Sequence, residues 1–298
     1  MLPQIWHGNY KSESEWNAAT EDMSVLHKIA DVLDDRILQS RHPFTFEAWC
    51  CVCRRIQPMR VAWDFAGQAE GSVWPAWTET AACAGCGLNS RMRALFSLLE
   101  GFNVSSDCPI YIGERVTAAY RKLEERFHNL TGSEYLGDSV LPGAEVDRDG
   151  LKIRHEDMTR LSFENGSFGL VITMEVFEHI PDYKAAFREA RRVLNDTGRM
   201  IFTIPFFPTQ SATSIRASVG EDGTITHHFP PEYHGNPVGD GSSLCFSHFG
   251  WDLLDELRWA GFATASANLY WGPWQGHLGT PFFVFHAGVA RQGTDAVS

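Results

Sequence analysis

The clearest hydrophobic pattern of the chain lies in residues 168–206, where two apolar runs flank an amphipathic segment. Residues 168–173 and 200–204 are almost wholly apolar, which is typical of strands buried on both faces. Between them, Pro181 suits the first turn of a helix. Apolar side chains then recur at helical spacing, at Ala186, Phe187, Ala190, Val193 and Leu194. The pattern predicts a strand–helix–strand unit, which builds parallel sheets whose ligands bind at the carboxyl ends of the strands.

The same periodicity predicts elements on both sides of this unit. Residues 12–39 should form one long amphipathic helix, with Ser12 and Glu15 as a capping box. Residues 89–99 and 251–260 should form shorter helices. Further strands are expected at 109–112, 131–135, 151–155, 262–271 and 280–285, with a helix after the first of them. This alternation predicts an α/β fold with a mostly parallel sheet.

Composition narrows the class of protein. The formal net charge of −12 over 298 residues disfavours a general nucleic-acid binder and a protein of anionic membrane surfaces. No apolar run suggests a signal peptide or a membrane span. The cysteine count is seven, an odd number, and four of these residues fall in two C-x-x-C pairs, which favours a reducing compartment. We therefore expect a soluble, cytoplasmic protein.

Residues 168–206 resemble the latter half of the class I S-adenosylmethionine-dependent methyltransferase domain, in its type 11 branch. That branch reads F-D-x-V, V-L-E-H-V and R-V-L-x-P-G-G. The positions that match are Phe168, Val171, Val176, Phe177, Glu178, His179, Ile180, Arg192, Val193, Leu194 and Gly198. Gly169 and Asp196-Thr197 depart from the pattern at turns. The resemblance, which extends over roughly residues 83–286, implies a Rossmann-like seven-stranded sheet whose final strand is antiparallel.

The resemblance also implies a division of the chain. Residues 1–48 would be a helical lid over the cofactor pocket, or a helix that only packs. Residues 49–90 would be a small Cys-rich module, and residues 91–288 the methyltransferase domain. Within the domain, residues 207–249 form a long insertion expected to bind the acceptor. Residues 289–298 would be a tail.

The cofactor site is expected at the strand ends. Glu134 ends the second strand, where a carboxylate ordinarily binds the ribose hydroxyls. The resemblance gives Asp157 a contact with the adenine amino group. A plain loop acid is the alternative for both residues. The other residues expected to line the cofactor are Tyr135, Met158, Met174, Glu175 and His179.

The first-strand motif departs from the usual G-x-G-x-G, because only Gly113 remains. Glu114 would bind the cofactor's ammonium group, and Thr117 would cap the next helix. A sub-branch of these enzymes has a similar departure, with E-x-x-T, then S-E-Y, and a C-x-x-C-x₄-R-x-R run. Glu175, Glu178 and His179 could instead be polar residues at a helix start. Some methyltransferases with the E-x-x-E-H pattern bind a divalent metal there.

Four cysteines have the spacing of a structural zinc site. Cys50 and Cys53 form one C-x-x-C pair, and Cys83 and Cys86 form the other. Four thiolates would make a closed site, with zinc replacing a core that so small a module cannot build. Cys51 could compete with Cys50 as a ligand. A metal-free packed module is the alternative.

The acceptor residues are expected in the insertion. Histidine exchanges a proton near neutral pH, so His234 is the first candidate, followed by Tyr233 and His228. The function predicted is methyl transfer from S-adenosylmethionine to a small-molecule acceptor. Alternatives are an intramolecular alkylation that uses the same cofactor, an RNA methyltransferase and a non-catalytic binding protein. The expected partners are the acceptor and, as an option, a second copy of the chain in a homodimer, but not nucleic acid or a membrane.

Overall fold

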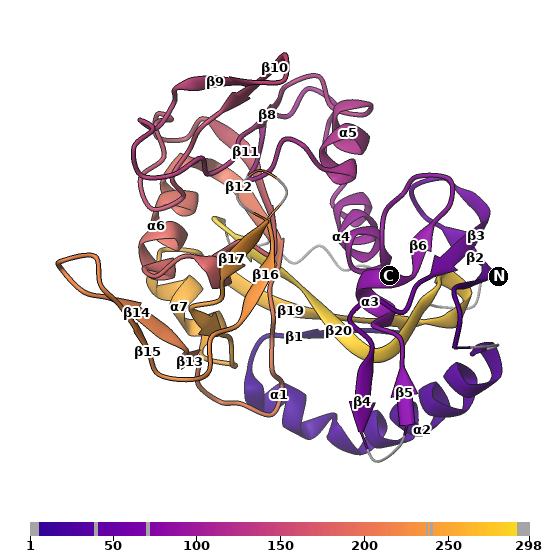
Figure 1. Ribbon diagram of the computed structural model, residues 1–298. Coiled ribbons are helices and arrows are strands. Elements are labelled where there is room, and N and C mark those ends of the chain that lie inside the picture. The colour runs from indigo at the N-terminus through magenta and orange to yellow at the C-terminus, as the bar shows by residue number, and fades with distance from the viewer. Residues whose placement is uncertain (1–5, 39–40, 70–71, 237, 239–240, 291–298) are drawn as a thin grey trace. The chain divides into compact units, whose positions relative to one another are not determined.

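The computed structural model describes residues 6–38, 41–69, 72–236, 238 and 241–290 (Figure 1). It divides into two compact units. One unit contains residues 1–104 and 267–284, and the other contains residues 105–266 and 285–298. Strands β19 (Thr264–Gly272) and β20 (His277–Gly288) pass from one unit to the other along the chain.

The main sheet has seven strands in the order β1-β19-β20-β12-β11-β7-β8. The bounds of the others are β1 Trp6–Tyr10, β7 Ile110–Ile112, β8 Leu130–Gly132, β11 Phe168–Met174 and β12 Leu194–Thr203. Strands β8, β7, β11 and β12 are parallel, and β20 is antiparallel to β12. The seven-stranded fold with an antiparallel final strand is confirmed.

Two details of the predicted sheet are wrong. The expected third strand is β10 (Leu151–Arg154), which instead forms a hairpin with β9 (Glu145–Arg148). Asp149 and Gly150 have positive φ values of 55° and 82°, as a tight hairpin turn requires, and the hairpin supplies the backbone partners of β10. Among the described residues, a parallel bridge between His155 and Glu134 extends the edge beyond β8. The seventh strand is β1, which pairs antiparallel with β19 and which the hydrophobic pattern did not predict.

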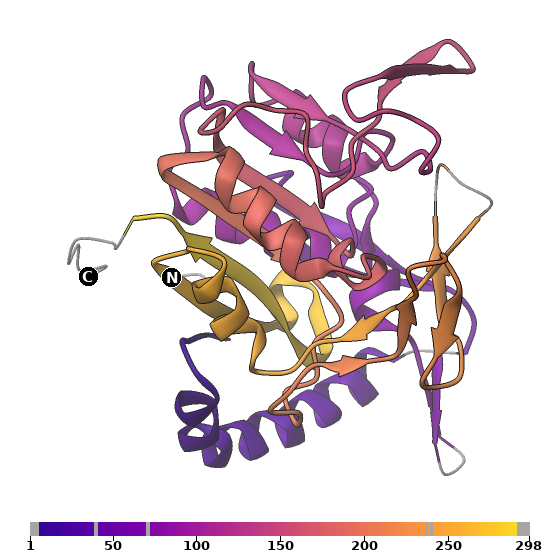
Figure 2. The ribbon, with the colours of Figure 1, turned by 90° about the vertical axis from the view of Figure 1, so that its left-hand side faces the viewer.

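The described helices of the second unit bury the apolar faces that the pattern predicts. They are α5 (Ala118–Glu124), α6 (Tyr183–Val193) and α7 (Leu253–Trp259). Figure 2 views the protein from the side on which α6 and α7 lie. The side chain of Asp182 caps α6 by accepting a hydrogen bond from the Ala185 N–H at 2.9 Å. Pro181 therefore precedes the cap and does not lie in the first turn. A 3₁₀ turn, η1 (Phe177–His179), follows β11.

The insertion is folded into three small antiparallel ribbons, drawn in orange in Figure 1. The pairs are β13 with β18, β14 with β15, and β16 with β17. Their bounds are β13 Ser214–Ile215, β14 Ala217–Val219, β15 Ile225–His227, β16 Tyr233–Gly235, β17 Ser242–Leu244 and β18 Ser247–His248.

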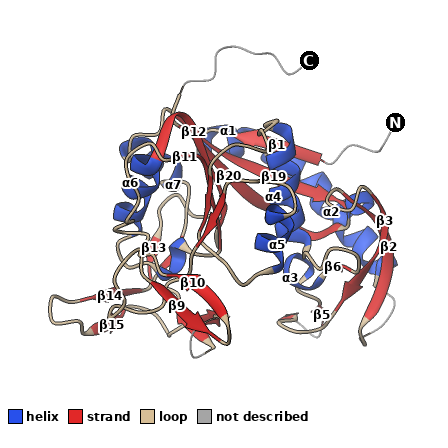
Figure 3. Cartoon of the chain, turned by 90° about the horizontal axis from the view of Figure 1, so that it is seen from above, coloured by secondary structure: helices blue, strands red, loops and turns tan. Residues whose placement is uncertain are grey.

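The first unit combines helices with short strands (Figure 3). The predicted long helix is interrupted at Ala19 into α1 (Glu13–Ala18) and α2 (Thr20–Ile37), and Ser12 caps α1 as expected. The remaining helical segments are α3 Trp77–Thr80, α4 Ser90–Gly101 and η2 Pro273–Gln275. The strands are β2 Phe44–Cys50, β3 Arg55–Val61, β4 Gly67–Ala69, β5 Ser72–Trp74 and β6 Ala82–Cys83.

Within this unit, Val61, Trp77, Ala81 and Leu278 form a buried apolar cluster. A cavity of 720 Å³ is lined in part by α2, at Ala30 and Asp31. The role of the N-terminal helices as a lid stays a prediction. Over the described part of the chain, none of the helices has the length and apolar character needed to cross a bilayer.

Candidate functional site

Glu134, just after β8, binds the backbone of the loop that follows β7 through hydrogen bonds. Its side chain is 7% exposed, and its Oε1 accepts hydrogen bonds from the N–H groups of Arg115 at 2.7 Å and Val116 at 3.1 Å. Burial raises the pKa of Glu134, and these two hydrogen bonds act in the opposite direction. The carboxylate thus lies at the carboxyl edge of the parallel strands, where ligands of such sheets bind.

The loop after β7 holds the three residues of the altered first motif. Thr117 caps α5, with its hydroxyl accepting from the Tyr120 N–H at 3.1 Å. Glu114 is buried, at 8% exposure. A Cβ added to Gly113 would lie 3.3 Å from Cγ2 of Thr173, tighter than ordinary contact. The remaining glycine therefore permits a close approach of the loop to β11.

Asp157, expected at the adenine, and Met158, expected to line the cofactor, follow the β9–β10 hairpin. Oδ1 of Asp157 accepts from the N–H of Thr159 at 2.8 Å and from its hydroxyl at 2.7 Å, which stabilises the turn. Met158 is buried, and the hydroxyl of Tyr111 donates to its sulfur at 3.4 Å. Tyr135 is half-exposed and donates a hydrogen bond to Asp138.

The carboxyl end of β11 carries an uncommon backbone conformation. Met174 is buried, and Glu175 has a φ of 53°, in the left-handed region that favours glycine. The N–H of Glu175 donates to the carbonyl of Thr203 at 3.0 Å, which joins this turn to the end of β12. Conformations of this kind cost free energy and gather at functional sites.

Beyond this turn lies a group that we call the Glu178 cluster, made of Glu178, His179 and His234. The carboxylate of Glu178 is fully buried, and its Oε1 lies 3.5 Å from Nε2 of His179 and 3.6 Å from Nδ1 of His234. Neither carboxylate oxygen accepts a hydrogen bond from the described residues. Burial, and next the charge of Glu175, raise the pKa of Glu178.

The two imidazoles of the cluster are oriented by their other nitrogens. Nδ1 of His179 donates to the carbonyl of Leu244 at 2.8 Å. Nε2 of His234 lies 3.0 Å from Oε1 of Glu232. The carboxylate of Glu178, and also that of Glu232, raises the pKa of His234 to about 9 against the effect of burial. The insertion therefore brings His234 to the turn after β11.

The other two acceptor candidates lie outside the cluster. Tyr233 is 58% exposed, and alternation along β16 points its side chain away from that of His234. His228 is exposed, with Nε2 3.0 Å from the hydroxyl of Ser218. Among the residues predicted for the cofactor or acceptor, the structure thus brings His234 and His179 to Glu178, and Glu175 is near enough for its charge to act on that carboxylate.

Sequence reasoning missed the partners of His234. Glu232 contacts Nε2 of His234 and Nε2 of His248, both at 3.0 Å, and Arg216 at 3.3 Å. The one signal that could have found it is the spacing of two between Glu232 and His234, which puts both side chains on one face of an extended segment. Glu178 matches the type 11 pattern and the E-x-x-E-H pattern and also suits a helix start, but none of these features links it to His234.

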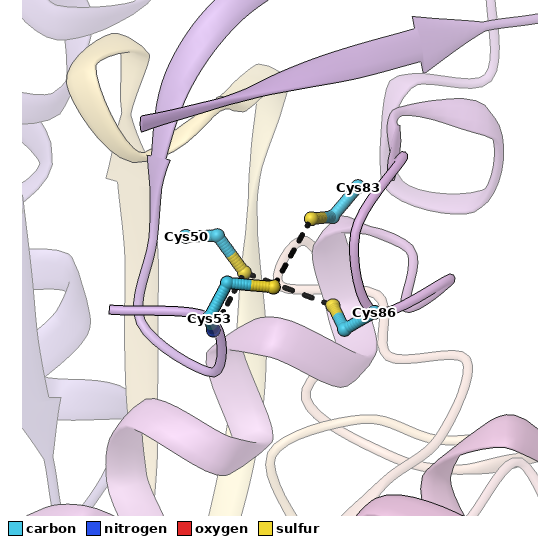
Figure 4. A group of neighbouring side chains, drawn as sticks. All are labelled: Cys50, Cys53, Cys83 and Cys86. Atoms are coloured by element: carbon cyan, nitrogen blue, oxygen red, sulfur yellow. Dashed lines mark hydrogen bonds between the residues drawn. The ribbon is translucent and has the colours of Figure 1, made fainter. Parts of the chain in front are cut away.

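The first unit holds the four predicted metal-ligating cysteines together (Figure 4). The sulfurs of Cys50 and Cys86 lie 3.7 Å apart, and those of Cys53 and Cys83 lie 3.8 Å apart. Four sulfurs about 2.3 Å from a tetrahedral Zn²⁺ would be separated by about 3.8 Å. The spacing therefore fits a tetrahedral metal site. Burial and the neighbouring thiolates raise the pKa of Cys53 to about 12 in the absence of a cation.

The structure distinguishes Cys50 from Cys51. The thiol of Cys51 donates to the carbonyl of Arg93 at 3.3 Å and does not join the four sulfurs. Arg93, the second arginine of the R-x-R run, is itself fully buried. Its guanidinium donates to the carbonyls of Gln275, Gly276 and Ala81.

Residues 112–202 match the protein family described as "Methyltransferase domain". This segment is a methyltransferase domain. It begins in β7 and ends in β12, and so contains the loop of Gly113, Glu134 and the turn after β11. The resemblance to the class I methyltransferases and the expectation of a transferase are thereby confirmed.

Several solved structures that are similar to this chain are described as methyltransferases, all at low sequence identity. One is the 1,6-didemethyltoxoflavin-N1-methyltransferase of Burkholderia thailandensis, with 14% identity, 66% of this chain and 77% of that chain covered, and a TM-score of 0.40. An S-adenosylmethionine-dependent methyltransferase of Mesorhizobium loti has 13% identity, coverage of 65% and 97%, and a TM-score of 0.39. A phosphoethanolamine N-methyltransferase of Haemonchus contortus has 13% identity, coverage of 60% and 39%, and a TM-score of 0.36. No curated protein matches the chain.

Proposed function

We propose that the protein is an S-adenosylmethionine-dependent methyltransferase that acts on a small molecule in the cytoplasm. The observation that carries the proposal is the buried carboxylate of Glu134, fastened to the loop after β7 inside the methyltransferase domain. A nucleoside cofactor needs an acid for its ribose hydroxyls at this edge of the sheet. Glu134 is the residue that meets this need.

The remaining contacts with the cofactor are assigned to residues at the same carboxyl edge of the parallel strands. Glu114 would bind the ammonium group of the cofactor, and Asp157 the adenine amino group. Met158 and Met174, both buried, would supply apolar contacts. The sulfonium of the cofactor is already activated for displacement, so the protein chiefly positions the methyl group in line with the nucleophile of the acceptor.

The acceptor side is assigned to the insertion, with His234 as its first residue. His234 is 29% exposed, and so is open to a ligand while it faces buried Glu178. A small molecule is favoured as acceptor, because the net charge of −12 opposes attraction to a nucleic-acid backbone.

For the cysteine module, we propose a structural zinc ion held by Cys50, Cys53, Cys83 and Cys86. The sulfur separations and the absence of disulfides among the described cysteines support this assignment. Free thiols agree with a reducing compartment.

Calorimetry with S-adenosylmethionine and S-adenosylhomocysteine tests the function. We expect micromolar binding of at least one of them, and its absence would remove the enzymatic proposal. Product analysis then separates the chemistries. Formation of S-adenosylhomocysteine with a methylated acceptor supports methyl transfer, whereas methylthioadenosine with a cyclised product indicates an intramolecular alkylation. Salt-sensitive RNA binding would instead favour an RNA methyltransferase.

A further inference from the structure

The cavity of 720 Å³ in the first unit belongs neither to the matched methyltransferase segment nor to the cysteine cluster. Its lining comes from the C-terminal half of α2 and the residue after it, from residues 73–78, and from residues 278–280 of β20 (Figure 1). Sites for small organic ligands have volumes of about 300–1,000 Å³. The cavity is therefore a candidate site for a ligand other than those already assigned.

Two tryptophans give the cavity aromatic walls. Trp77 is buried, and the rings of Phe44 and Phe46 contact it edge to face, with centroids 6.2 and 6.3 Å away. Trp74 is exposed and pairs with Gly67 across the β4–β5 ribbon. A side chain at position 67 would collide with the indole, so glycine lets the ring of Trp74 lie against β4. These contacts restrict both indoles before any ligand binds.

The charged residues among the described lining are two aspartates. Asp31 and Asp35 are four residues apart in α2, so their carboxylates lie on one face of the helix. Like charges at this spacing repel each other, and Asp35 also lies in the last turn, at the negative end of the helix dipole. Neither carboxylate forms an ion pair with another described residue. Arg36 adjoins Asp35 in sequence, but neighbouring side chains of a helix point about 100° apart, and Arg36 does not line the cavity.

We propose that this cavity binds a small organic amine that carries an aromatic ring. The ammonium group would lie near Asp31 and Asp35 and over the face of Trp74, because the indole is the strongest π partner for a cation. The ring would pack further inside against Trp77 and Leu278, which are both buried. A cation at this place would also offset the repulsion between the two carboxylates.

Other classes of ligand use these residues less well. An anion such as a phosphate would meet two negative charges and, among the described lining residues, no Lys, Arg or His. A bare metal ion would leave most of the cavity unfilled. A neutral aromatic compound would contact the indoles but would gain nothing from the aspartates. The site lies within the first unit, so its occupancy is separate from the binding of S-adenosylmethionine.

Three indoles that differ chiefly in charge test the proposal on the full chain. At pH 7 tryptamine is a cation, tryptophol is neutral and indole-3-acetate is an anion. Calorimetry should find that tryptamine binds most tightly and that tryptophol binds about 3- to 30-fold more weakly, the range for two exposed ion pairs. Indole-3-acetate should bind most weakly. Equal affinity for tryptamine and tryptophol, or no binding of tryptamine, would overturn the proposal.

Substitutions then show whether the amine binds in this cavity. The double variant Asp31→Asn with Asp35→Asn removes the charges but also a repulsion within α2, so it should fold. It should bind tryptamine no more tightly than tryptophol. Trp74→Leu keeps an apolar side chain but removes the π face, and it should weaken tryptamine binding by about 2- to 5-fold.

Asp64→Asn is the matched control, because Asp64 is an exposed aspartate of the same unit that does not line the cavity. It should keep the wild-type affinity for tryptamine. Unchanged affinity in the double aspartate variant would mean that the amine binds elsewhere, and it would overturn the proposal. An equal loss in Asp64→Asn would also count against it, since the effect would then reflect the net charge of the protein and not the cavity.

Discussion

The cysteine cluster and the Glu178 cluster are both candidate metal sites. They differ in the kinds of ligand that they offer and in the exposure of those ligands. The first has four ligands of one kind, and Cys50, Cys83 and Cys86 are buried. The second has mixed ligands, and its two imidazoles are 18% and 29% exposed. A closed tetrathiolate site contributes folding free energy, whereas a site with an open position serves a ligand. The difference predicts opposite responses to substitution.

The two clusters also differ in how the chain builds them. Each C-x-x-C pair brings two thiols together within one short turn, so the cysteine cluster needs only two segments to meet. The Glu178 cluster joins the turn after β11 to β16 of the insertion. Its carboxylate is buried at a cost that the fold must offset elsewhere. Stability is therefore expected to depend on the cysteine cluster, and chemistry on the Glu178 cluster.

The largest effect is expected from Cys83→Ser. Loss of one thiolate should release the metal and, with it, a large part of the binding free energy, which is on the order of 10 kcal/mol for small zinc modules. The first unit should lose its cooperative thermal transition, and metal analysis should find about one zinc ion fewer per chain.

Cys51→Ser is the matched control for this experiment. Cys51 neighbours Cys50 in sequence but has its thiol on the carbonyl of Arg93. Its substitution should leave the metal content unchanged. A wild type without metal in the cysteine cluster, or a Cys51→Ser protein that loses it, would contradict the assignment.

A second large effect is expected from Arg93→Met. The variant leaves the carbonyls of Gln275, Gly276 and Ala81 without their buried donor. The free energy of unfolding should fall by about 3–5 kcal/mol, the range for breaking a buried charged interaction. Urea unfolding measures it. Arg54→Met is the control, since the side chain of Arg54 is 73% exposed and pairs with Glu100 at 3.0 Å, so its loss should cost at most about 1 kcal/mol. Equal losses of unfolding free energy in the two variants would mean that the buried hydrogen bonds of Arg93 stabilise the fold no more than a surface ion pair does.

The contrast in construction also explains what the sequence could predict. The β11–α6–β12 unit is contiguous, and each of its elements has its own apolar period, so periodicity identified all three. The cysteine cluster was predicted because its spacing is local. The third strand was assigned to the wrong sheet, because an apolar run does not say which strand it pairs with. Its partner β9 lay in a stretch without a clear period.

Contacts between residues far apart in the chain could not be predicted either, because the sequence does not say which distant segments meet. His234 was the first acceptor candidate, but nothing in the order of residues linked it to Glu178. Strand β1 was missed because its five residues include a glycine and show no alternating apolar face. The roles of His234, Tyr233 and His228 toward the acceptor stay predictions.

A moderate effect is expected from Glu134→Gln on cofactor affinity. The amide oxygen of Gln can still accept from the N–H groups of Arg115 and Val116, so the loop should keep its shape. Loss of the charge weakens the bonds to the ribose hydroxyls by about 1–3 kcal/mol, or about 5- to 150-fold in Kd. Calorimetry with S-adenosylhomocysteine measures this change. Glu145→Gln, an exposed acid of β9, should bind normally, and unchanged affinity in Glu134→Gln would remove the ribose assignment.

The smallest effect is expected from Glu178→Gln on the free energy of unfolding. It is also the sharpest test of the difference between the two clusters. Removing a buried charge that lacks hydrogen bonds should leave the free energy of unfolding unchanged or raise it by about 1 kcal/mol in the absence of added metal, since neutral groups cost less to bury. Urea unfolding without added metal would measure the change beside that of Cys83→Ser. A loss of several kcal/mol would mean that the pairing of Glu178 with His234 stabilises the fold by itself. The Glu178 cluster would then be a structural ion pair, and its contrast with the cysteine cluster would disappear.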